Sequence, residues 1–487
     1  MGWEDPDPAE VLRLSSEEDW RELGSRYDPN LIVRPLERCL AVARESGAKT
    51  VVIETRYLDP DYRSEYSSFF SRTFAGIPDT AHRLHFFGAE VETDELASLP
   101  TGAGETYIGY MVVRPSPLGR VGRTLLLPPP DLHGAIQTSV TASVHFFGQE
   151  LTVTGVPFAQ QDTQFGRCAH VAAWMCHYTA ALRGDVARRP MADFSLLADP
   201  SVAEGRPLPS QGLTGLQLSN LMREFDLPPI VYRMGQLPGP DPAPEDPAAD
   251  PGTWDTRAVA VLCRFLNSSH PVLVGTREHA FVVIGYRREL RDEKPWIGFV
   301  RHDDQRGPYL LVDDILHDVD PLSGDRYSPW QLLVAPVPDK LWLLPEAAER
   351  VGREYLIRYD ALEGGRTLAG LQDDVRLTFR TTAMASSHFK ECADDRGLDG
   401  ETVRELRLAR LPRLVWVVEA IDRQARADRR PCVVGEAVFD STSSDSAPNL
   451  LALRVPGALL IHQTNGTIRS PLPATREPVR SAARFQP

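Results

Sequence analysis

A cysteine and a histidine occur in local contexts that suit nucleophilic catalysis. Cys168 follows a loop that contains Gly166 and opens a segment of helical period rich in small residues, AHVAAWMCHYTAAL. A thiol attacks only as its thiolate, and both the positive end of a helix and a neighbouring imidazole stabilise that anion. His279 immediately precedes the apolar run AFVVIGY, so we expect it at the start of a strand. We therefore predict that Cys168 is a nucleophile and that His279 is its base.

An imidazole that acts as a base needs a third group to hold its ring, usually a carboxylate or an amide. The segment HDDQRGPY, at the end of the strand that follows His279, supplies Asp303 and Asp304. Side chains alternate along a strand, so we expect only one of the two carboxylates to point at the imidazole. The alternation does not decide between them.

Attack on a carbonyl also needs hydrogen-bond donors for the oxyanion that develops in the transition state. The backbone amide of Cys168 can be one donor. The run QQDTQFGR just upstream provides the side-chain amides of Gln161 and Gln164, either of which can be the second.

This order of residues resembles the papain-like superfamily of cysteine peptidases and is most similar to the bacterial C39-like peptidases. QQDTQFGRC places Gln161 where that family has its oxyanion glutamine, and HAFVVIGY is similar to the family's histidine strand. DDQRG echoes the family's aspartate segment, which favours Asp303 over Asp304. The resemblance covers about residues 155–335 and departs from the family at Ala169, where a glycine is common.

The resemblance implies an α+β fold with a papain-like core. A helix would carry Cys168, and an antiparallel sheet would carry His279 and Asp303. It implies a cysteine-dependent hydrolase, a peptidase or isopeptidase, that forms a covalent acyl-enzyme on a peptide or protein substrate without a cofactor. Two alternatives remain: an acyltransferase of the transglutaminase type on the same core, and a papain-like binding or regulatory module without turnover.

Three further side chains near the nucleophile raise the question of a metal site: His170, Cys176 and His177. Structural zinc sites usually show paired short spacings such as C-x-x-C, and none is present. The pair Glu278–His279 does not form H-E-x-x-H, and no P-loop or G-x-S-x-G occurs. We therefore expect no metal.

Composition narrows the function further. A formal net charge of −14 argues against nucleic-acid binding, which needs a basic surface. No stretch approaches eighteen apolar residues, so we expect no membrane-spanning helix. The start MGWEDPDPAE has no apolar segment typical of a secretory signal, and the six cysteines are widely spread without framework spacing. These features favour a cytoplasmic protein with free thiols.

Composition and hydrophobic period divide the chain into three regions: residues 1–150, 151–338 and 339–487. The first is expected to be an α+β domain of unknown role, and the second is the papain-like domain, interrupted by an acidic Pro-rich insert at 237–252. The third is expected to be an α+β domain with a mobile tail. The flanking domains could recognise a partner protein.

Periodicity predicts the main elements. We expect helices at residues 31–46, 213–226, 255–267, 344–355 and 401–427. We expect strands in TVVIETRYL, YIGYMVVRP, SVTASVHFFGQELTVTGV, PVLVGT, HAFVVIGY, WIGFVRH, RPCVVGEAVFD and LLALRVPGALLIH.

Overall fold

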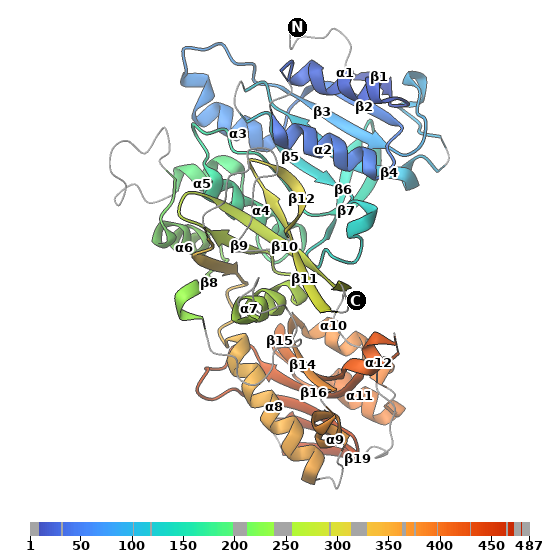
Figure 1. Cartoon of the computed structure of the whole chain (residues 1–487), viewed down its shortest axis with the longest axis vertical. Coiled ribbons are helices and arrows are strands. Elements are labelled where there is room, and N and C mark those ends of the chain that lie inside the picture. The colour runs from blue at the N-terminus through green and yellow to red at the C-terminus, as the bar shows by residue number, and fades with distance from the viewer. Residues whose placement is uncertain are drawn as a thin grey trace. The chain divides into compact units, whose positions relative to one another are not determined.

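The chain folds into two compact units, each of which mixes helices with β-sheet (Figure 1). The first unit comprises Met1–Gly235, His270–Arg288 and Ile297–Pro338, and the second comprises Gln236–Ser269, Glu289–Trp296 and Asp339–Pro487. The computed structural model describes residues 9–30, 33–100, 102–116, 119–197, 212–237, 256–291, 294–312, 329–362, 367–374, 376–396, 398–428, 430–463, 466–471 and 479. The mixed α and β content agrees with the expected α+β class.

A five-stranded antiparallel sheet begins the first unit. Its strands lie in chain order: β1 (Ala9–Arg13), β2 (Thr50–Tyr57), β3 (Ala81–Phe87), β4 (Tyr107–Val113) and β5 (Val121–Leu126). One face packs on α1 (Glu17–Tyr27) and α2 (Arg34–Glu45). The other face packs on a hairpin of β6 (Val140–Phe146) and β7 (Gln149–Gly155). Helix α3 (Pro60–Ser68) follows β2.

The hairpin explains the long alternating run in the sequence. Buried and exposed residues alternate along β6, and the sequence turns back at Phe147 and Gly148, both with positive φ. The polar side therefore faces solvent, and the apolar side covers the sheet. The predicted single strand-like run is thus two paired strands.

A six-stranded sheet forms the other half of the first unit, in the order β12-β11-β10-β9-β13-β8. Its strands are β8 (Pro229–Arg233), β9 (Val272–Gly275), β10 (Ala280–Arg291), β11 (Lys294–Asp303), β12 (Gly307–Val312) and β13 (Leu332–Pro336). Helix α4 (Cys168–Leu182) packs against β9 and against the helices α5 (Met191–Leu196) and α6 (Gly215–Glu224). A capping box of Thr214 and Gln217 begins α6.

Close contacts join the segment between β5 and β6 to β10 of the six-stranded sheet. Ile136 forms a β-bridge with Gly285 of β10, and the Thr138 hydroxyl donates to the carbonyl of Ile284 at 2.8 Å. The approach is so close that a Cβ on Gly285 would lie 1.9 Å from the carbonyl oxygen of Ala135. Residues on both sides of the expected boundary at position 150 therefore belong to the same unit.

The second unit is built on a six-stranded antiparallel sheet. Its strands again lie in chain order: β14 (Leu377–Ala385), β15 (Leu414–Asp422), β16 (Val433–Asp440), β17 (Leu450–Val455), β18 (Ala458–Gln463) and β19 (Gly466–Pro471). Its helices are α7 (Thr256–Asn267), α8 (Pro345–Leu362), α9 (Thr367–Asp373), α10 (Ser386–Glu391), α11 (Gly400–Leu408) and α12 (Arg423–Ala427). Helix α8 covers one face, and α10 and α11 cover the other.

The expected helix over residues 401–427 is wrong in its middle. Helix α11 ends at Leu408, and LVWVVEAID then forms the strand β15. Helices cover both faces of β15, so nearly every residue is buried and the sequence shows a continuous apolar run rather than alternation. Such a run does not distinguish a buried strand from a helix by period alone.

Two expectations concern segments at the margin of the described residues. The Pro-rich insert at 237–252 lies outside them except for its first residue, and so does most of the tail after Pro471. Among the described residues, none of the helices has the length and apolar character needed to cross a membrane.

Candidate active site

Cys168 is the first residue of α4, as the sequence predicts. The first N–H groups of a helix have no partner within the helix, and together with the helix dipole they favour an anion at this end. Cys168 is partly exposed, whereas the following residues of α4 from Ala169 to Ala180 are buried. The thiol therefore sits at the accessible end of a helix that is otherwise part of the core.

The loop before Cys168 is shaped by the buried carboxylate of Asp162. Its Oδ1 accepts from the backbone N–H groups of Gln164, Phe165 and Gly166 at 2.7, 2.6 and 3.2 Å. Three successive amides around one carboxylate hold the loop in a fixed turn. The start of α4 consequently has one orientation relative to the residues just upstream.

His279 lies in the turn that joins β9 to β10. Its backbone N–H donates to the Thr276 hydroxyl at 3.0 Å, and its carbonyl accepts from the Thr276 N–H at 2.8 Å. The turn places His279 one residue before Ala280, where β10 begins. The prediction that this histidine opens a strand is confirmed.

Both candidate carboxylates lie against the imidazole. Oδ1 of Asp303 is 3.0 Å from Nε2 of His279, and Oδ1 of Asp304 is 3.7 Å from the same atom. The expectation that only one could point at the ring is wrong, because β11 ends at Asp303 and the pairing with β12 shifts just before it. Asp304 therefore follows turn geometry rather than strand alternation.

Three further contacts hold Asp303 and the Nδ1 edge of the His279 ring. Oδ1 of Asp303 accepts from the backbone N–H of Gln305 at 3.0 Å, and its Oδ2 lies 3.6 Å from Nη2 of the buried Arg301. The Gln305 side-chain amide lies 3.3 Å from Nδ1 of His279. Since Nε2 is committed to Asp303, Nδ1 is the nitrogen left to exchange a proton with a thiol.

The charges around His279 favour its protonated form. Burial lowers the pKa of His279, but the Asp303 carboxylate, its hydrogen bond and a hydrogen bond with the Cys168 side chain together hold it well above the usual 6.5. Burial opposes ionisation of Asp303 as well, yet the imidazolium and Arg301 hold the pKa of Asp303 well below its ordinary value. The pair is thus an imidazolium held by a carboxylate.

Asp304 differs from Asp303 although both are fully buried. Burial raises the pKa of Asp304 to about 7; the nearby Asp303 charge adds to this and His279 opposes it. Among the described residues neither oxygen of Asp304 has a well-aligned hydrogen bond, although the N–H of Gln161 lies close enough to favour its charged form. Asp303 is therefore the charged partner of the imidazole, and Asp304 holds a proton up to about neutral pH.

The two candidate oxyanion donors have different settings. Gln161 is buried, and its backbone lies beside the Asp304 carboxyl in the same cluster as His279. Gln164 is half-buried, and its backbone N–H is bound to Asp162. The cluster therefore brings together five of the six predicted residues, and Gln161 rather than Gln164 belongs to it.

Within the described part of the chain, one group of three side chains could hold a metal ion: His279, Asp303 and Asp304, with potential ligand atoms within 4.8 Å of one another. The residues weighed from sequence do not join it. His170 caps α4 by accepting from the backbone N–H of Arg167, and the ring of His177 packs against two phenylalanines.

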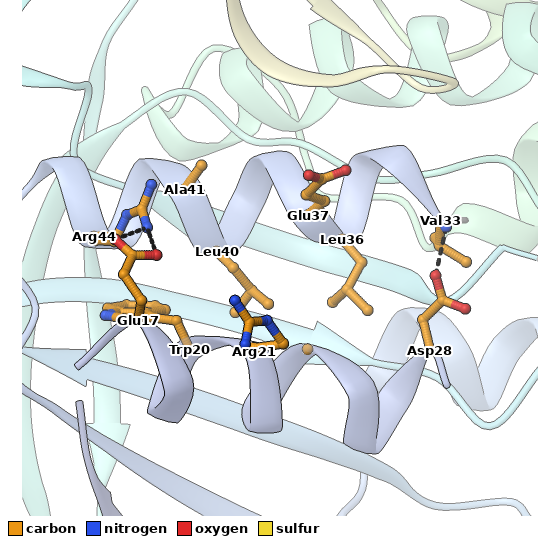
Figure 2. A pocket seen from close by; sticks show the side chains of 11 residues that line it. Glu17, Trp20, Arg21, Asp28, Val33, Leu36, Glu37, Leu40, Ala41 and Arg44 are labelled. Carbon is orange, nitrogen blue, oxygen red and sulfur yellow. Dashed lines mark hydrogen bonds and ion pairs between the residues drawn. The ribbon is translucent and has the colours of Figure 1, made fainter. Parts of the chain in front are cut away.

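Two other features of the first unit, its buried thiols and its pocket, are poor candidates for a catalytic site. Burial raises the pKa of Cys39 and Cys176 well above the ordinary value for a thiol. A pocket of about 260 Å³ lies between α1 and α2 and is lined by residues such as Trp20, Leu40 and Arg44, none of them a candidate for catalysis (Figure 2).

Comparison with known proteins adds no assignment: no family model matches this sequence, and no curated protein matches it at a significant level. The site stands on its own geometry. Sequence reasoning missed Asp162, Arg301 and Gln305. The only local signal was the Asp-x-x-x-Gly spacing from Asp162 to Gly166, which suits a side chain that bonds to the backbone ahead of it.

Proposed function

We propose that this chain is a cysteine hydrolase that cleaves an amide or isopeptide bond, with a papain-like arrangement of Cys168, His279 and Asp303. The observation that carries the proposal is the meeting of three segments far apart in sequence. The start of α4, the β9–β10 turn and the end of β11 bring a helix-terminal thiol, an imidazole and a buried carboxylate together.

The reaction follows from the protons that each group holds. In the reactive form Nδ1 of His279 holds the proton that the Cys168 thiol has given up, and the resulting thiolate attacks the carbonyl carbon of the substrate. The oxyanion is bound by the backbone N–H of Cys168 and the side-chain amide of Gln161. The imidazolium then protonates the leaving amine as the C–N bond breaks. Water, deprotonated by His279, hydrolyses the thioester and restores the thiol.

Asp303 acts on the imidazole rather than on the substrate. By accepting the Nε2–H it selects the tautomer whose Nδ1 lone pair can receive the thiol proton, and it stabilises the imidazolium that results. The raised pKa of His279 is consistent with this role. No cofactor takes part in any step.

One observation favours a second candidate, a metal centre. His279, Asp303 and Asp304 present one nitrogen and two carboxylates at a spacing that a divalent ion could bridge. A metal on Nε2 would replace the proton that Asp303 accepts, so the two functions exclude each other at this atom.

The test is the rate of iodoacetamide alkylation at each cysteine, read by peptide mass spectrometry from about pH 5 to 9 on the native chain and on His279→Ala. A catalytic pair predicts that Cys168 reacts fastest below pH 8 and that His279→Ala removes this advantage. Cys392 is a matched internal reference. It also lies near a histidine, His388 at 3.9 Å, but at the C-terminal end of its helix.

The outcome separates the functional classes. A Cys168 that alkylates no faster than Cys392 and ignores the substitution favours a binding or regulatory module. An activated Cys168 whose thioester with a test peptide is released by added amines in preference to water favours an acyltransferase. Release by water favours the hydrolase.

A further inference from the structure

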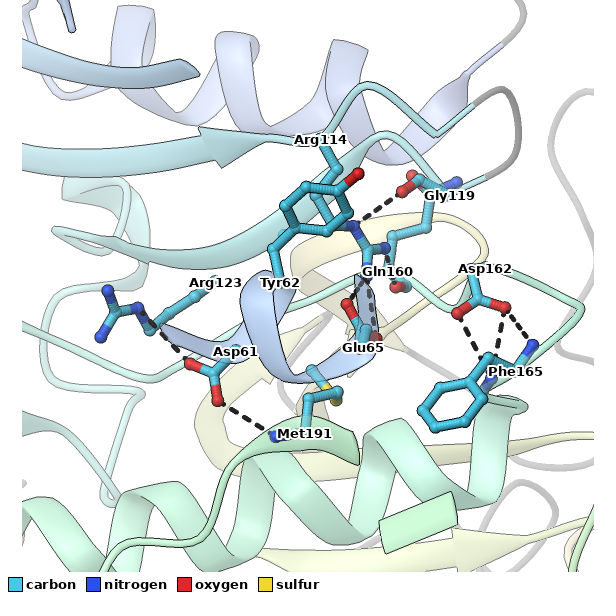
Figure 3. Close-up of polar contacts among 12 residues, drawn as sticks. Asp61, Tyr62, Glu65, Arg114, Gly119, Arg123, Gln160, Asp162, Phe165 and Met191 are labelled. Carbon is cyan, nitrogen blue, oxygen red and sulfur yellow. Dashed lines mark hydrogen bonds and ion pairs between the residues drawn. The ribbon is translucent and has the colours of Figure 1, made fainter. Parts of the chain in front are cut away.

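The loop that carries Gln161 is held in place by the N-terminal region of the chain. It runs from the end of β7 at Gly155 to Cys168, and the carboxylate of Asp162 organises only its second half. The first half is bound instead at Gln160, by Arg114 just after β4 and by Val121 of β5; Figure 3 shows the contact of Arg114 with Gln160.

Arg114, which follows β4, is the centre of these contacts. It is buried, and its guanidinium makes five hydrogen bonds, which matches the number of its N–H donors. Nε donates to the carbonyl of Gly119 at 2.9 Å, and Nη2 donates to the carbonyls of Val121 and Gln160 at 3.2 and 2.6 Å. Arg114 therefore ties the loop to the β4–β5 connection through main-chain atoms.

The remaining donors of Arg114 are bound by Glu65. Nη1 lies 3.3 and 3.0 Å from the two carboxylate oxygens, and both side chains are almost fully buried. Removing one partner would leave a buried charge without compensation. Helix α3, which carries Glu65, is anchored in turn by Asp61, whose carboxylate accepts from the backbone N–H of Met191 at 3.1 Å (Figure 3).

The backbone of Gln161, the proposed oxyanion donor, packs directly against Gly119. Gly119 has φ +70°, and a Cβ at this position would lie 2.4 Å from the carbonyl oxygen of Gln161 and 2.6 Å from Cα of Asp162. Gln160 and Val121 are paired as well, through a backbone bond of 2.9 Å and a bond from the Val121 N–H to Oε1 of Gln160 at 3.1 Å. Gln161 thus has little freedom to shift along or away from this surface.

We propose that Arg114 and Glu65 are positioning residues for oxyanion stabilisation, which makes the N-terminal region part of the catalytic apparatus rather than a separate module. The inference rests on the proposed function, because it assumes that Gln161 donates to the oxyanion. Arg114 acts through the carbonyl of Gln160, one residue before that donor, and touches neither thiol nor imidazole in the contacts described.

Two probes of Cys168 separate this role from thiol activation. Iodoacetamide reacts at a saturated carbon, so its rate depends on the thiolate and needs no oxyanion donor. p-Nitrophenyl acetate acylates the same thiol through a tetrahedral oxyanion, so its rate depends on both. The ratio of the acylation rate to the alkylation rate therefore reports the oxyanion donors alone.

Arg114→Lys keeps the positive charge but loses most of the hydrogen-bond donors of the guanidinium. We expect it to lower this ratio by ~10-fold or more, since loss of one oxyanion donor lowers kcat by ~10²–10³ in other hydrolases. The alkylation rate should stay within about twofold of the native rate. Gln161→Ala should give a similar loss, and the double variant should lose no more than the larger of the two.

The matched control is Arg396→Lys in the second unit. Arg396 is equally buried and pairs with Glu436 through Nη2 at 3.0 Å and Nε at 3.1 Å. It should affect stability without changing the ratio. If Arg114→Lys does not fold, Gly119→Ala tests the positioning of Gln161 by another route, because its Cβ would displace the Gln161 backbone directly, with the same expected loss.

Failures of the two proposals look different. A native Cys168 that is not activated toward iodoacetamide refutes the hydrolase and the inference with it. A native Cys168 that alkylates fast but is not acylated refutes an oxyanion site at Gln161. Normal acylation in Arg114→Lys, or losses that multiply in the double variant, overturns the inference while leaving the hydrolase intact.

Discussion

Replacing Asp303 by Asn removes the charge nearest to the His279 imidazole while keeping the size of the side chain. Oδ1 of Asp303 lies 3.0 Å from Nε2, and the carboxylate is fully buried. Two unit charges about 4 Å apart at an effective dielectric of about 20 interact by ~4 kcal/mol. This corresponds to roughly three orders of magnitude in the equilibrium between the thiolate–imidazolium pair and the neutral pair.

Two effects reduce what an experiment would measure. Asp304, at 3.7 Å from Nε2, can ionise once the competing charge of Asp303 is gone and replaces part of the interaction. A less basic thiolate is also a weaker nucleophile, so only about half of the change, on a logarithmic scale, appears in an alkylation rate. We therefore expect Asp303→Asn to slow iodoacetamide labelling of Cys168 by ~10- to 30-fold at pH 6.

Asp304→Asn is the matched control, because it makes the same change at the neighbouring residue. With a pKa of about 7, Asp304 is already neutral at pH 6, so its replacement should change labelling less than about threefold there. The effect should grow above pH 7, where the carboxyl is charged. Native labelling in Asp303→Asn at pH 6, or a larger effect from Asp304→Asn at that pH, would refute the assignment of Asp303 as the orienting carboxylate.

Four further outcomes follow from the same structure. The pKa of His279 is raised, so the imidazolium that protonates the leaving amine should persist through neutral pH. The alkaline fall in amide turnover marks the loss of this proton, and it should move to lower pH in Asp303→Asn. The same raised pKa adds stability below pH 6.5 that is lost as the pH rises through the folded-state value, which urea unfolding at several pH values would detect. Dialysis against EDTA should leave Cys168 labelling unchanged, and a change of more than about threefold, or a stoichiometric divalent ion in elemental analysis, would favour the metal centre. In the second unit, a Cβ on Gly352 would lie 3.0 Å from the Val418 side chain. Gly352→Ala should therefore lower the unfolding free energy by about 1–3 kcal/mol through crowding, offset in part by better helix propensity, with Cys168 labelling as the unaffected control.

Local signals were sufficient for some elements and not for others. The helix that begins at Cys168 and the strand that begins at Ala280 were predicted from short stretches of sequence, because the residues that indicate them lie within a few positions of one another. The segment at 414–422 reads as helix because both of its faces are buried, and only its place in the middle of a sheet makes it a strand. The prediction therefore failed where tertiary burial removed the alternation on which it depends.

The two aspartates show the same limit within the site. Alternation along β11 predicts that one of them faces away from the imidazole, but the strand ends at Asp303 and the turn brings Asp304 to the same nitrogen. Where a strand ends is decided by its pairing partner, here by the register shift against β12. Local sequence carries no information about that register.

The sequence by itself determined the chemical groups available and the local settings of three of them: a thiol at a helix start, an imidazole before a strand and carboxylates after the next. Each setting depends on neighbours in the chain, such as the small residues that follow Cys168 and the apolar run after His279. Only the tertiary structure decided which groups share one space. The contact of Nε2 with Asp303 spans 24 residues, and that of Arg114 with Gln160 spans 46. Such contacts arise because separate elements bury their apolar faces together, and their outcome depends on packing across the whole unit.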